Sequence, residues 1–454
     1  MRSNSKPNPI AGIPPDEVAR RYEDRALARV SDVALFERVI ELVARPKRRT
    51  NSYALHIGME TMARFRLLCR LSGQTRREWA RKQAVAMASA YQHLDEDLPA
   101  PSPAVGGGSK NPLERLLAAV DVGEVDDADR YAGLVASQMT SDLLIGPLAN
   151  ATLAHLGAAG HAPIFLSLAH RVGTALPTMT MLPTIARGLA EGTQHRLGPA
   201  SVEDDQQLPG VDRPEQGESI YDAFNGALLR APHVGPAAAG GIRATVEHAM
   251  RHTGPALAIE QPLRRWTRDR APTRAAAHAA LAGVVAGAAR LMLEEPRRDA
   301  KYHWTHCLTI PQGVWALSPV LEDRTMALRV ATTLAVAFVA TKGKSEIRGP
   351  LDLPDGGCPL AEALTEDPTL AAAAAWQTPP EAVGQVHEQL AFEASARNDA
   401  HLVKFVLACL DGAAMNRRDA PLYRAAAAYL TSIWVREVPA DQLPEHLHSR
   451  TRAS

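Results

Sequence analysis

The stretch SARNDAHLVKFVLACLDGAA, residues 395–414, decides the fold class of this chain. From Ala400 onward it is apolar at almost every position, and its polar side chains are His401, Lys404 and Asp411. A helix that is apolar on nearly all sides is buried in a protein core. Steps of three and seven residues place the three polar side chains on one helical face. The segment therefore predicts a buried helix with a single polar stripe.

Lys404 is the unusual member of this stripe, because lysine is almost never fully buried without a partner. Its ammonium group either extends to water or lies in a polar pocket built around the stripe. In a pocket, burial disfavours the charged amine and lowers its pKa, which leaves a neutral nucleophile or ligand. The competing interpretation is an ion pair between Lys404 and Asp411 beside a hydrogen-bonded histidine.

The composition extends the helical prediction to the whole chain. Alanine runs such as Ala371–Ala375 and Ala425–Ala428 are frequent, and alternating β-branched segments are scarce. Alanine has the highest helix propensity, so we expect an all-α, multi-helix, bundle-like domain with an N-terminal helical extension. Fifty basic residues balance fifty acidic ones, so no overall field attracts nucleic acid or an anionic membrane surface.

Several common classes of site are not indicated. The four cysteines are widely spaced and form no CxxC pair, which argues against a disulfide framework or a thiolate zinc site. Lys110 lies in GGGSK, but the spacing of a phosphate-binding P-loop and its preceding strand are missing. The N-terminus has no apolar signal core, and no uncharged apolar run reaches about 18 residues. We expect a soluble, cytoplasmic protein without membrane contact.

Proline and glycine clusters divide the chain into segments. A further helix break is expected at Pro311. The expected segments are a flexible tail at 1–15, an N-terminal helical region at 16–97, a Pro/Gly linker at 98–112, a helical domain at 113–437 with a polar loop at 197–219, and a polar tail at 438–454.

Histidines in apolar helical settings are the candidate functional residues, since each needs a buried partner. His303 and His306 are three residues apart, so two imidazoles on one helical face can share a metal or a substrate group. HxxH alone is a weak signal, and one member of such a pair commonly lies on the surface. His161, behind Gly160, faces an apolar run; taken alone, a structural buried histidine explains it better.

Two further histidines have equally open interpretations. His56 and Glu60 are four residues apart, which suits a metal-ligand pair, a carboxylate that orients an imidazole, or a surface hydrogen bond. His278 is the only polar side chain in the long apolar stretch that follows Arg274. A hydrogen bond to a neighbouring helix is its simplest explanation.

The segments WTHCLTIPQ (304–312) and DAHLVK (399–404) resemble the questin oxidase-like family of all-helical proteins. His306 with Thr309 matches a His-x-x-Thr segment of the family, and His401 with Lys404 matches a late His-x-x-Lys segment. The similarity covers roughly residues 140–435. The first hundred or so residues resemble an addition in a bacterial branch, which has an LHxxxE segment similar to the one at His56.

The family's early Asn-His-x-Pro segment resembles the sequence around His161, where Gly160 replaces the asparagine. Characterised fungal members act on anthraquinones, either as NADPH-using ring-opening oxygenases or as non-haem iron enzymes. In the iron enzymes, four histidines and a carboxylated lysine hold the metal. The resemblance thus implies iron ligands at His161, His306, His401 and Lys404, with His278 and then His56 as candidates for the fourth histidine.

The resemblance implies an oxidoreductase that uses oxygen against an aromatic polyketide-like or other planar small molecule. Trp304, Trp315 and Phe405 are candidates to line its pocket, although core packing explains each of them individually better. Thr309 and Gln312 are candidates to orient ligands or substrate. The alternative is a catalytically silent helical binding or scaffold protein that keeps the fold without its metal. The oligomeric state stays open.

Overall fold

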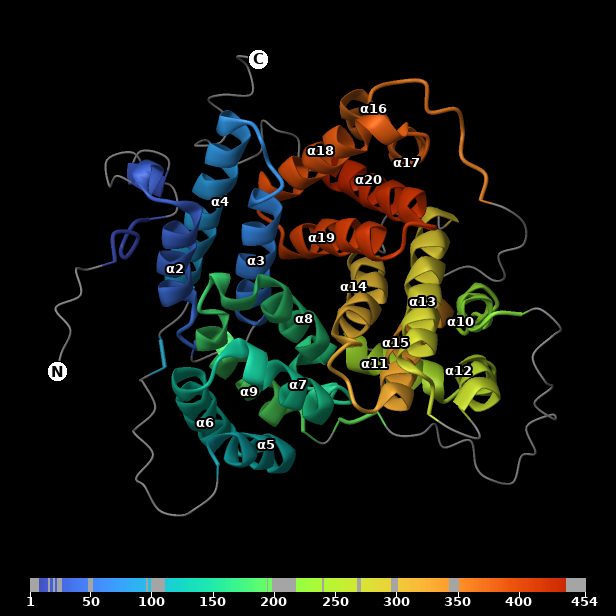
Figure 1. Cartoon of the computed structure of the whole chain (residues 1–454), viewed down its shortest axis with the longest axis horizontal. Helices are drawn as coiled ribbons and strands as arrows, with labels where there is room; N and C mark the ends of the chain where they lie inside the picture. Colours follow the sequence, from blue (N-terminus) through green and yellow to red (C-terminus); the bar gives the residue numbers. More distant parts are fainter. Residues whose placement is uncertain are drawn as a thin grey trace.

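In a computed structural model, the chain folds into packed helices (Figure 1). The structure describes residues 8–14, 17–18, 21–22, 27–47, 52–94, 97–98, 111–193, 195–197, 218–238, 241–267, 271–294, 301–342 and 351–437. Within these ranges it has 19 α-helices and no strand, which confirms the all-α prediction. Most of the expected linker, most of the polar loop and the whole tail at 438–454 lie outside the described residues. Of the flexible tail expected at 1–15, residues 8–14 are described, and Ile10 and Ile13 are fully buried in the core, so the prediction of a flexible tail is wrong for this part.

The first eight helices include the N-terminal region and the beginning of the larger helical region. Their bounds are α2 (Asp32–Val43), α3 (Ser52–Leu68), α4 (Gln74–Gln92), α5 (Pro112–Val122), α6 (Val125–Gln138), α7 (Ser141–Thr152), α8 (Ala162–Val172) and α9 (Leu182–Glu191). The others are α10 (Ile220–Leu229), α11 (Ile242–Met250), α12 (Thr253–Thr267), α13 (Arg274–Glu294), α14 (Lys301–Leu317), α15 (Arg324–Lys342), α16 (Leu360–Glu366), α17 (Pro368–Trp376), α18 (Val383–Ser395), α19 (Ala400–Met415) and α20 (Ala420–Glu437).

Four helices from distant parts of the sequence form a closed ring of packing contacts. Helix α3 packs against α8 and α19, and α14 also packs against α8 and α19. Figure 1 shows α19 lying between α3 and α14, with α8 close to both. Since α3 precedes residues 98–112 in the chain, the N-terminal region contributes directly to this ring.

Helix α19 is the buried helix that its sequence predicts. Every residue from Leu402 to Ala413 is buried, including Lys404 and Asp411. Asp399 caps its N-terminus, because its carboxylate accepts hydrogen bonds from the backbone N–H groups of His401 and Leu402. The sequence thus fixes both the burial of the helix and the residue at which it begins.

The predicted helix break at Pro311 is wrong, because α14 continues through this proline to Leu317. A proline inside a helix removes one backbone hydrogen bond and costs about 3 kcal/mol. Ile310 and Val314, on either side of it, are fully buried. We attribute the continuity of α14 to such tertiary packing, which overrides the local preference.

Gly313 lets α14 approach the beginning of α8. A Cβ atom at this position would lie 2.8 Å from the backbone oxygen of Pro163, closer than real Cβ contacts. This contact sets the distance between the helix that carries His306 and the helix end that carries His161.

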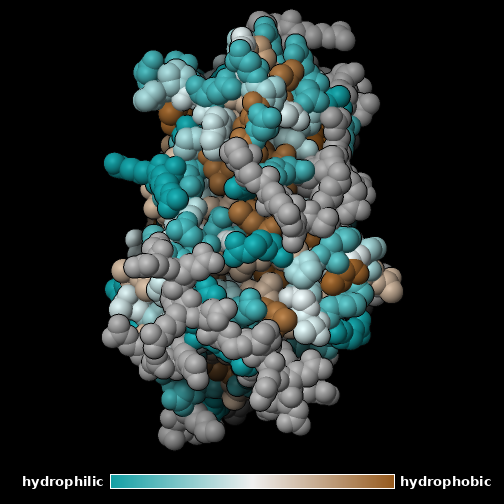
Figure 2. Space-filling model, turned by 90° about the vertical axis from the view of Figure 1, so that its right-hand side faces the viewer, coloured by the Kyte–Doolittle hydropathy of each residue, from teal (hydrophilic) through white to brown (hydrophobic). Residues whose placement is uncertain are grey.

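Within the described part of the chain, two helices are long and apolar enough to cross a membrane by length and composition alone, α13 and the Arg324–Thr341 part of α15. In both, 78% of the apolar window is buried inside the protein. Figure 2 shows one face of the molecule, where hydrophilic side chains surround separate hydrophobic patches. The burial of these two helices is that of core helices.

Candidate metal centre

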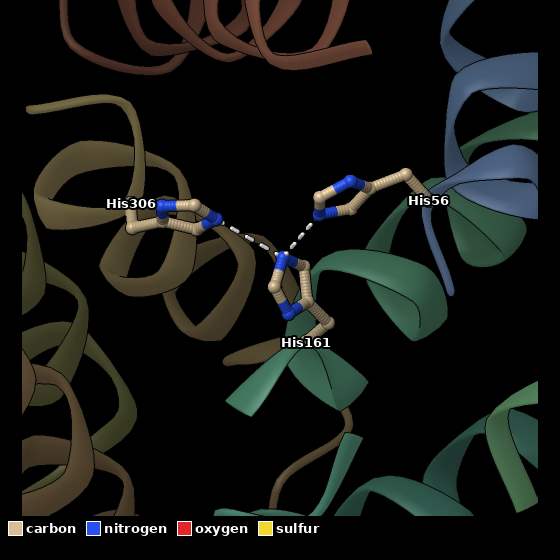
Figure 3. A group of neighbouring side chains, drawn as sticks. All are labelled: His56, His161 and His306. Atoms are coloured by element: carbon tan, nitrogen blue, oxygen red, sulfur yellow. Dashed lines mark hydrogen bonds between the residues drawn. The ribbon is translucent and has the colours of Figure 1, made fainter. Parts of the chain in front are cut away.

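Three histidines from three different helical segments converge at one point (Figure 3). His56 comes from α3, His161 precedes the first residue of α8, and His306 comes from α14. The Nε2 atoms of His56 and His161 are 2.9 Å apart, and those of His161 and His306 are 3.1 Å apart. The three candidate ligand atoms all lie within 4.8 Å of one another.

The backbone fixes the tautomer of two of these rings. Nδ1 of His161 lies 3.0 Å from the carbonyl oxygen of Ala158, and Nδ1 of His306 lies 2.7 Å from that of Tyr302. A carbonyl oxygen only accepts, so each Nδ1 carries the proton and donates it. The Nε2 atoms of the neutral rings therefore both carry lone pairs, and these face each other. Two lone pairs at this distance repel unless a proton or another cation lies between them.

A proton shared between these Nε2 atoms is unfavourable in this buried environment. Burial lowers the pKa of His56, His161 and His306, and the nearby Lys404 and neighbouring histidines lower it further. Neutral imidazoles with Nδ1–H bonded to carbonyl groups are the form in which histidine binds metals.

The spacing of the nitrogen atoms also suits a metal. Two ligands at about 2.1 Å from one ion and at right angles to each other lie about 3.0 Å apart. The Nε2–Nε2 separations of 2.9 and 3.1 Å match two such pairs of ligands. The convergence of lone pairs and the spacing together define a candidate cation site.

His401 completes a group of four imidazoles. Its ring centroid lies 4.4 Å from that of His56 and 5.1 Å from that of His306. Nδ1 of His401 lies 3.6 Å from Oδ1 of Asp399, the residue that caps α19. A carboxylate behind an imidazole is the usual arrangement that orients a metal-binding histidine.

Asp399 stays ionised in this position. Burial alone raises its pKa, but hydrogen bonds from the side chains of His401 and Trp434 and from the backbone of Leu402 lower it to about 2. The hydroxyl group of Tyr302 also donates to its other oxygen, at 3.3 Å. The carboxylate is thus a fixed negative charge behind His401.

Lys404 lies one turn after His401 and is only 3% exposed. Its ammonium nitrogen has no hydrogen-bond partner among the described residues. Burial lowers the pKa of Lys404 to about 7, although Glu60 and Asp399 act in the opposite direction. The buried-pocket interpretation of the sequence is confirmed, and the lysine interacts electrostatically with His56, His161, His306 and His401.

Glu60 and Arg64 connect α3 to the segment before α19. Glu60 is fully buried, and its Oε1 accepts a hydrogen bond of 2.8 Å from Nε of Arg64. The same guanidinium donates to the carbonyl oxygens of Ser395 and Arg397. The other carboxylate oxygen of Glu60 has no hydrogen-bond partner in the part of the chain that the structure describes. These hydrogen bonds fix α3, which carries His56, against the segment that leads to His401.

The turn before His161 has an unusual backbone. Ala158, Ala159 and Gly160 all have positive φ angles, of 51°, 49° and 68°. This conformation is strained for alanine, and glycine and asparagine adopt it more readily. The turn presents the carbonyl of Ala158 to His161, and glycine at its third position adopts the positive φ angle without steric cost.

The structure brings together His56, His161, His306, His401 and Lys404. It does not bring His278 to this site: the ring of His278 lies 5.3 Å from that of Trp315. Trp315 follows His306 by nine residues on α14, which is about 13 Å along a helix. The ranking of His278 before His56 as the fourth histidine was therefore wrong, because His278 faces the core farther along α14.

Other predicted residues also have definite positions. The ring of His303 lies 6.3 Å from that of Phe338, and His303 is not a member of the histidine group. Trp304, Trp315 and Phe405 are buried members of the hydrophobic core. The competing interpretation, an ion pair between Lys404 and Asp411, is not found among the described residues. Asp411 pairs with arginines instead: Arg66, Arg70 and Arg171.

Sequence reasoning missed Asp399 and Arg64. Asp399 had a signal, because an aspartate directly before an apolar helical run is a common N-cap. Arg64 had only the local signal of its four-residue spacing from Glu60, since its other partners are backbone oxygens 331 and 333 residues away.

Comparisons with family models, curated proteins and solved structures returned no match.

Proposed function

We propose that the chain is a mononuclear non-haem iron oxygenase of the questin oxidase-like type. The proposed metal centre rests on one observation. The Nε2 atoms of His161 and His306 are 3.1 Å apart, and their lone pairs face each other because both Nδ1 protons are donated to backbone carbonyls. A bundle that gathers ligands from facing helices is a common way to build such a site. The choice of iron rests on the resemblance of two short segments.

The residues present fit a metal. His56, His161, His306 and His401 offer imidazole nitrogens, and Lys404 lies beside them without a hydrogen-bond partner. Imidazole nitrogen suits iron as well as zinc, copper and nickel. Lys404, as its carbon dioxide adduct, adds an anionic oxygen, and this offsets part of the charge of a divalent ion.

Iron at this position would supply a redox centre that activates oxygen. The chain's own residues hold this position: Asp399 orients His401, and the Ala158 carbonyl orients His161. The buried apolar surroundings exclude bulk water. A planar aromatic molecule is the proposed substrate, on the strength of the resemblance. An NADPH-using oxygenase is the other form of this proposal, and the histidine convergence favours the iron form.

The test is anaerobic purification of the full chain, loading with Fe(II), removal of excess metal and elemental analysis. We expect about one iron per chain, lost in His161→Ala and in His401→Ala. The matched control is His278→Ala, which removes a histidine outside the group and should leave the iron content unchanged. A chain that binds zinc but not iron contradicts the oxygenase. A folded chain that binds no metal contradicts the metal centre and supports the scaffold alternative.

A further inference from the structure

A pocket of about 300 Å³ lies between α10 and α12. Pockets that bind small organic molecules begin at about this volume. Figure 1 shows α10 and α12 on the right-hand side of the molecule, beyond α13 and far from α3, so the pocket is separate from the histidine group. Arg230 and Gln261 line the pocket and are exposed, which means that it opens to solvent on their side.

Close packing of α12 against the chain that follows α10 forms one wall of the pocket. A Cβ atom at Gly254, the second residue of α12, would lie 2.5 Å from Cγ of Pro232, closer than real Cβ contacts. The deeper lining is apolar and includes the buried side chains of Ala223, Ala227 and Pro262. None of the described lining residues is aromatic, so this part suits a compact aliphatic group better than a stacked ring.

Arg230, directly after α10, supplies the first positive charge of the pocket. Its guanidinium lies against Gly226 one turn earlier, since a Cβ atom there would be 2.7 Å from Nη1 of Arg230. The glycine thus leaves room for the side chain to fold back along α10. No ion pair or hydrogen bond between this guanidinium and another described residue is found.

Arg265 supplies the second positive charge and is only partly paired. Its Nη1 donates a hydrogen bond of 2.6 Å to Oε2 of Glu218, which also lines the pocket. Its Nε is buried and has no hydrogen-bond partner in the described ranges. A buried N–H donor without an acceptor is unfavourable, and an occupant that accepts a hydrogen bond removes this cost.

The charges of the lining favour an occupant with one negative charge. Arg230 and Arg265 carry two positive charges, and Glu218 balances one of them. A carboxylate completes this balance and matches the planar guanidinium group. A doubly charged phosphate exceeds it and is repelled by Glu218.

We propose that this pocket binds a short aliphatic monocarboxylate. Arg230 and the Nε–H of Arg265 hold its carboxylate at the open side, and its hydrocarbon part lies against Ala223, Ala227 and Pro262. The inference is independent of the proposed metal centre, because no residue of the histidine group lines this pocket.

The experiment is isothermal titration calorimetry of the full-length chain with hexanoate. A chelator keeps the chain free of metal, which excludes coordination of the carboxylate at the histidine group. We expect one hexanoate per chain, bound at millimolar or lower concentration. Hexanamide, an uncharged molecule of the same shape, should bind at least about tenfold more weakly, because it forms no charge-assisted hydrogen bond. Inorganic phosphate should not displace hexanoate.

Variants then locate the binding site. Arg230→Gln should weaken hexanoate binding at least about fivefold. Ala258→Phe fills the pocket from α12 and should abolish binding. The matched control is Arg274→Gln, because Arg274 is an exposed arginine at the start of α13 that does not line the pocket. Its affinity should equal that of the wild type.

Glu218→Gln is the sharpest variant, because it should tighten binding by about threefold. The substitution removes the carboxylate that competes with hexanoate for Arg265. Damage to the fold does not produce a gain in affinity.

Several results overturn the proposal. A folded wild-type chain that binds no hexanoate does so, and so does equal binding of hexanoate and hexanamide. Displacement of hexanoate by an equal concentration of phosphate identifies a general anion site instead. Affinity that is unchanged in Arg230→Gln and Ala258→Phe, or weakened in Glu218→Gln, removes hexanoate from this pocket.

Discussion

Helix α19 carries two buried polar side chains, one toward each end, and they differ in how fully they are paired. At one end, Asp411 is buried and is surrounded by three arginines that together satisfy both of its oxygens. At the other end, Lys404 is equally buried, and no described residue forms a hydrogen bond with its ammonium nitrogen. Complete pairing stabilises a fold, whereas an unpaired buried group persists when it serves a ligand. The comparison indicates that the Asp411 end stabilises the fold, whereas the Lys404 end is where the proposed function places a ligand.

The largest expected effect is the loss of metal in Lys404→Met. Methionine keeps most of the apolar stem and removes the nitrogen, so the variant should fold and bind no iron. Lys404→Arg should fail as well, because a guanidinium cannot deprotonate to join a metal site. Elemental analysis after Fe(II) loading checks both variants. Full iron occupancy in folded Lys404→Met would remove Lys404 from the proposed ligand set.

Asp411→Ala should have its largest effect on stability. Removing the shared partner leaves three partly buried guanidinium groups uncompensated, and we expect a loss of about 3 kcal/mol in the free energy of unfolding. Urea denaturation of the metal-free protein measures it. The control is Asp129→Ala. The closest ion pair of Asp129 is with a single arginine, Arg187, so this substitution should lower the free energy of unfolding less. Equal losses would refute the special role given to the three-arginine arrangement.

The pH dependence of stability sharpens the same comparison. The folded pKa of Lys404 is about 7, below its ordinary value of 10.5, so between these values the unfolded chain binds a proton that the folded chain does not. Stability should therefore rise with pH in this window, by up to about 1.4 kcal/mol per unit, or roughly 2 kcal/mol from pH 7.5 to 9. The quantity to measure is the difference between wild-type and Lys404→Met metal-free proteins in denaturant. A difference that is constant from pH 7.5 to 9 contradicts a lysine with a lowered pKa.

The smallest effect concerns the turn before His161. Ala159 is exposed and has a positive φ angle, so Ala159→Gly should relieve backbone strain and raise stability by about 1 kcal/mol. The same change at Ala118, an exposed residue inside α5, should lower stability by about 1 kcal/mol. Thermal unfolding of both variants measures these two changes in stability. Changes of the same sign would show that Ala159 is not strained.

The sequence predicted the features that depend on local pattern. The apolar residues of 400–414 predicted a buried helix, and the spacing of His401 and Lys404 placed them on one face. These two inferences succeed because helical periodicity is a property of neighbouring residues. The expectation that His306 and His401 share one site came from the resemblance and not from periodicity, and their rings lie 5.1 Å apart.

What the sequence could not predict depends on tertiary packing. His278 and His56 both lie in helical segments with apolar neighbours, and periodicity does not say which one faces the other histidines. The answer depends on α3 packing against α8 and α19, contacts between segments more than a hundred residues apart. Pro311 failed as a break for the same reason, since the packing of Ile310 and Val314 is invisible in local propensity.

The origin of the histidines in distant helices has a consequence for the order of folding. His56 and His161 are separated by 105 residues, and His161 and His306 by 145, so no contiguous half of the chain contains the whole group. Contacts of such sequence separation form late, after the loop-closure entropy between them has been lost. Under the proposed function, metal affinity should thus appear only when synthesis and folding of nearly the entire chain are complete, and a nascent or truncated chain should not retain the ion.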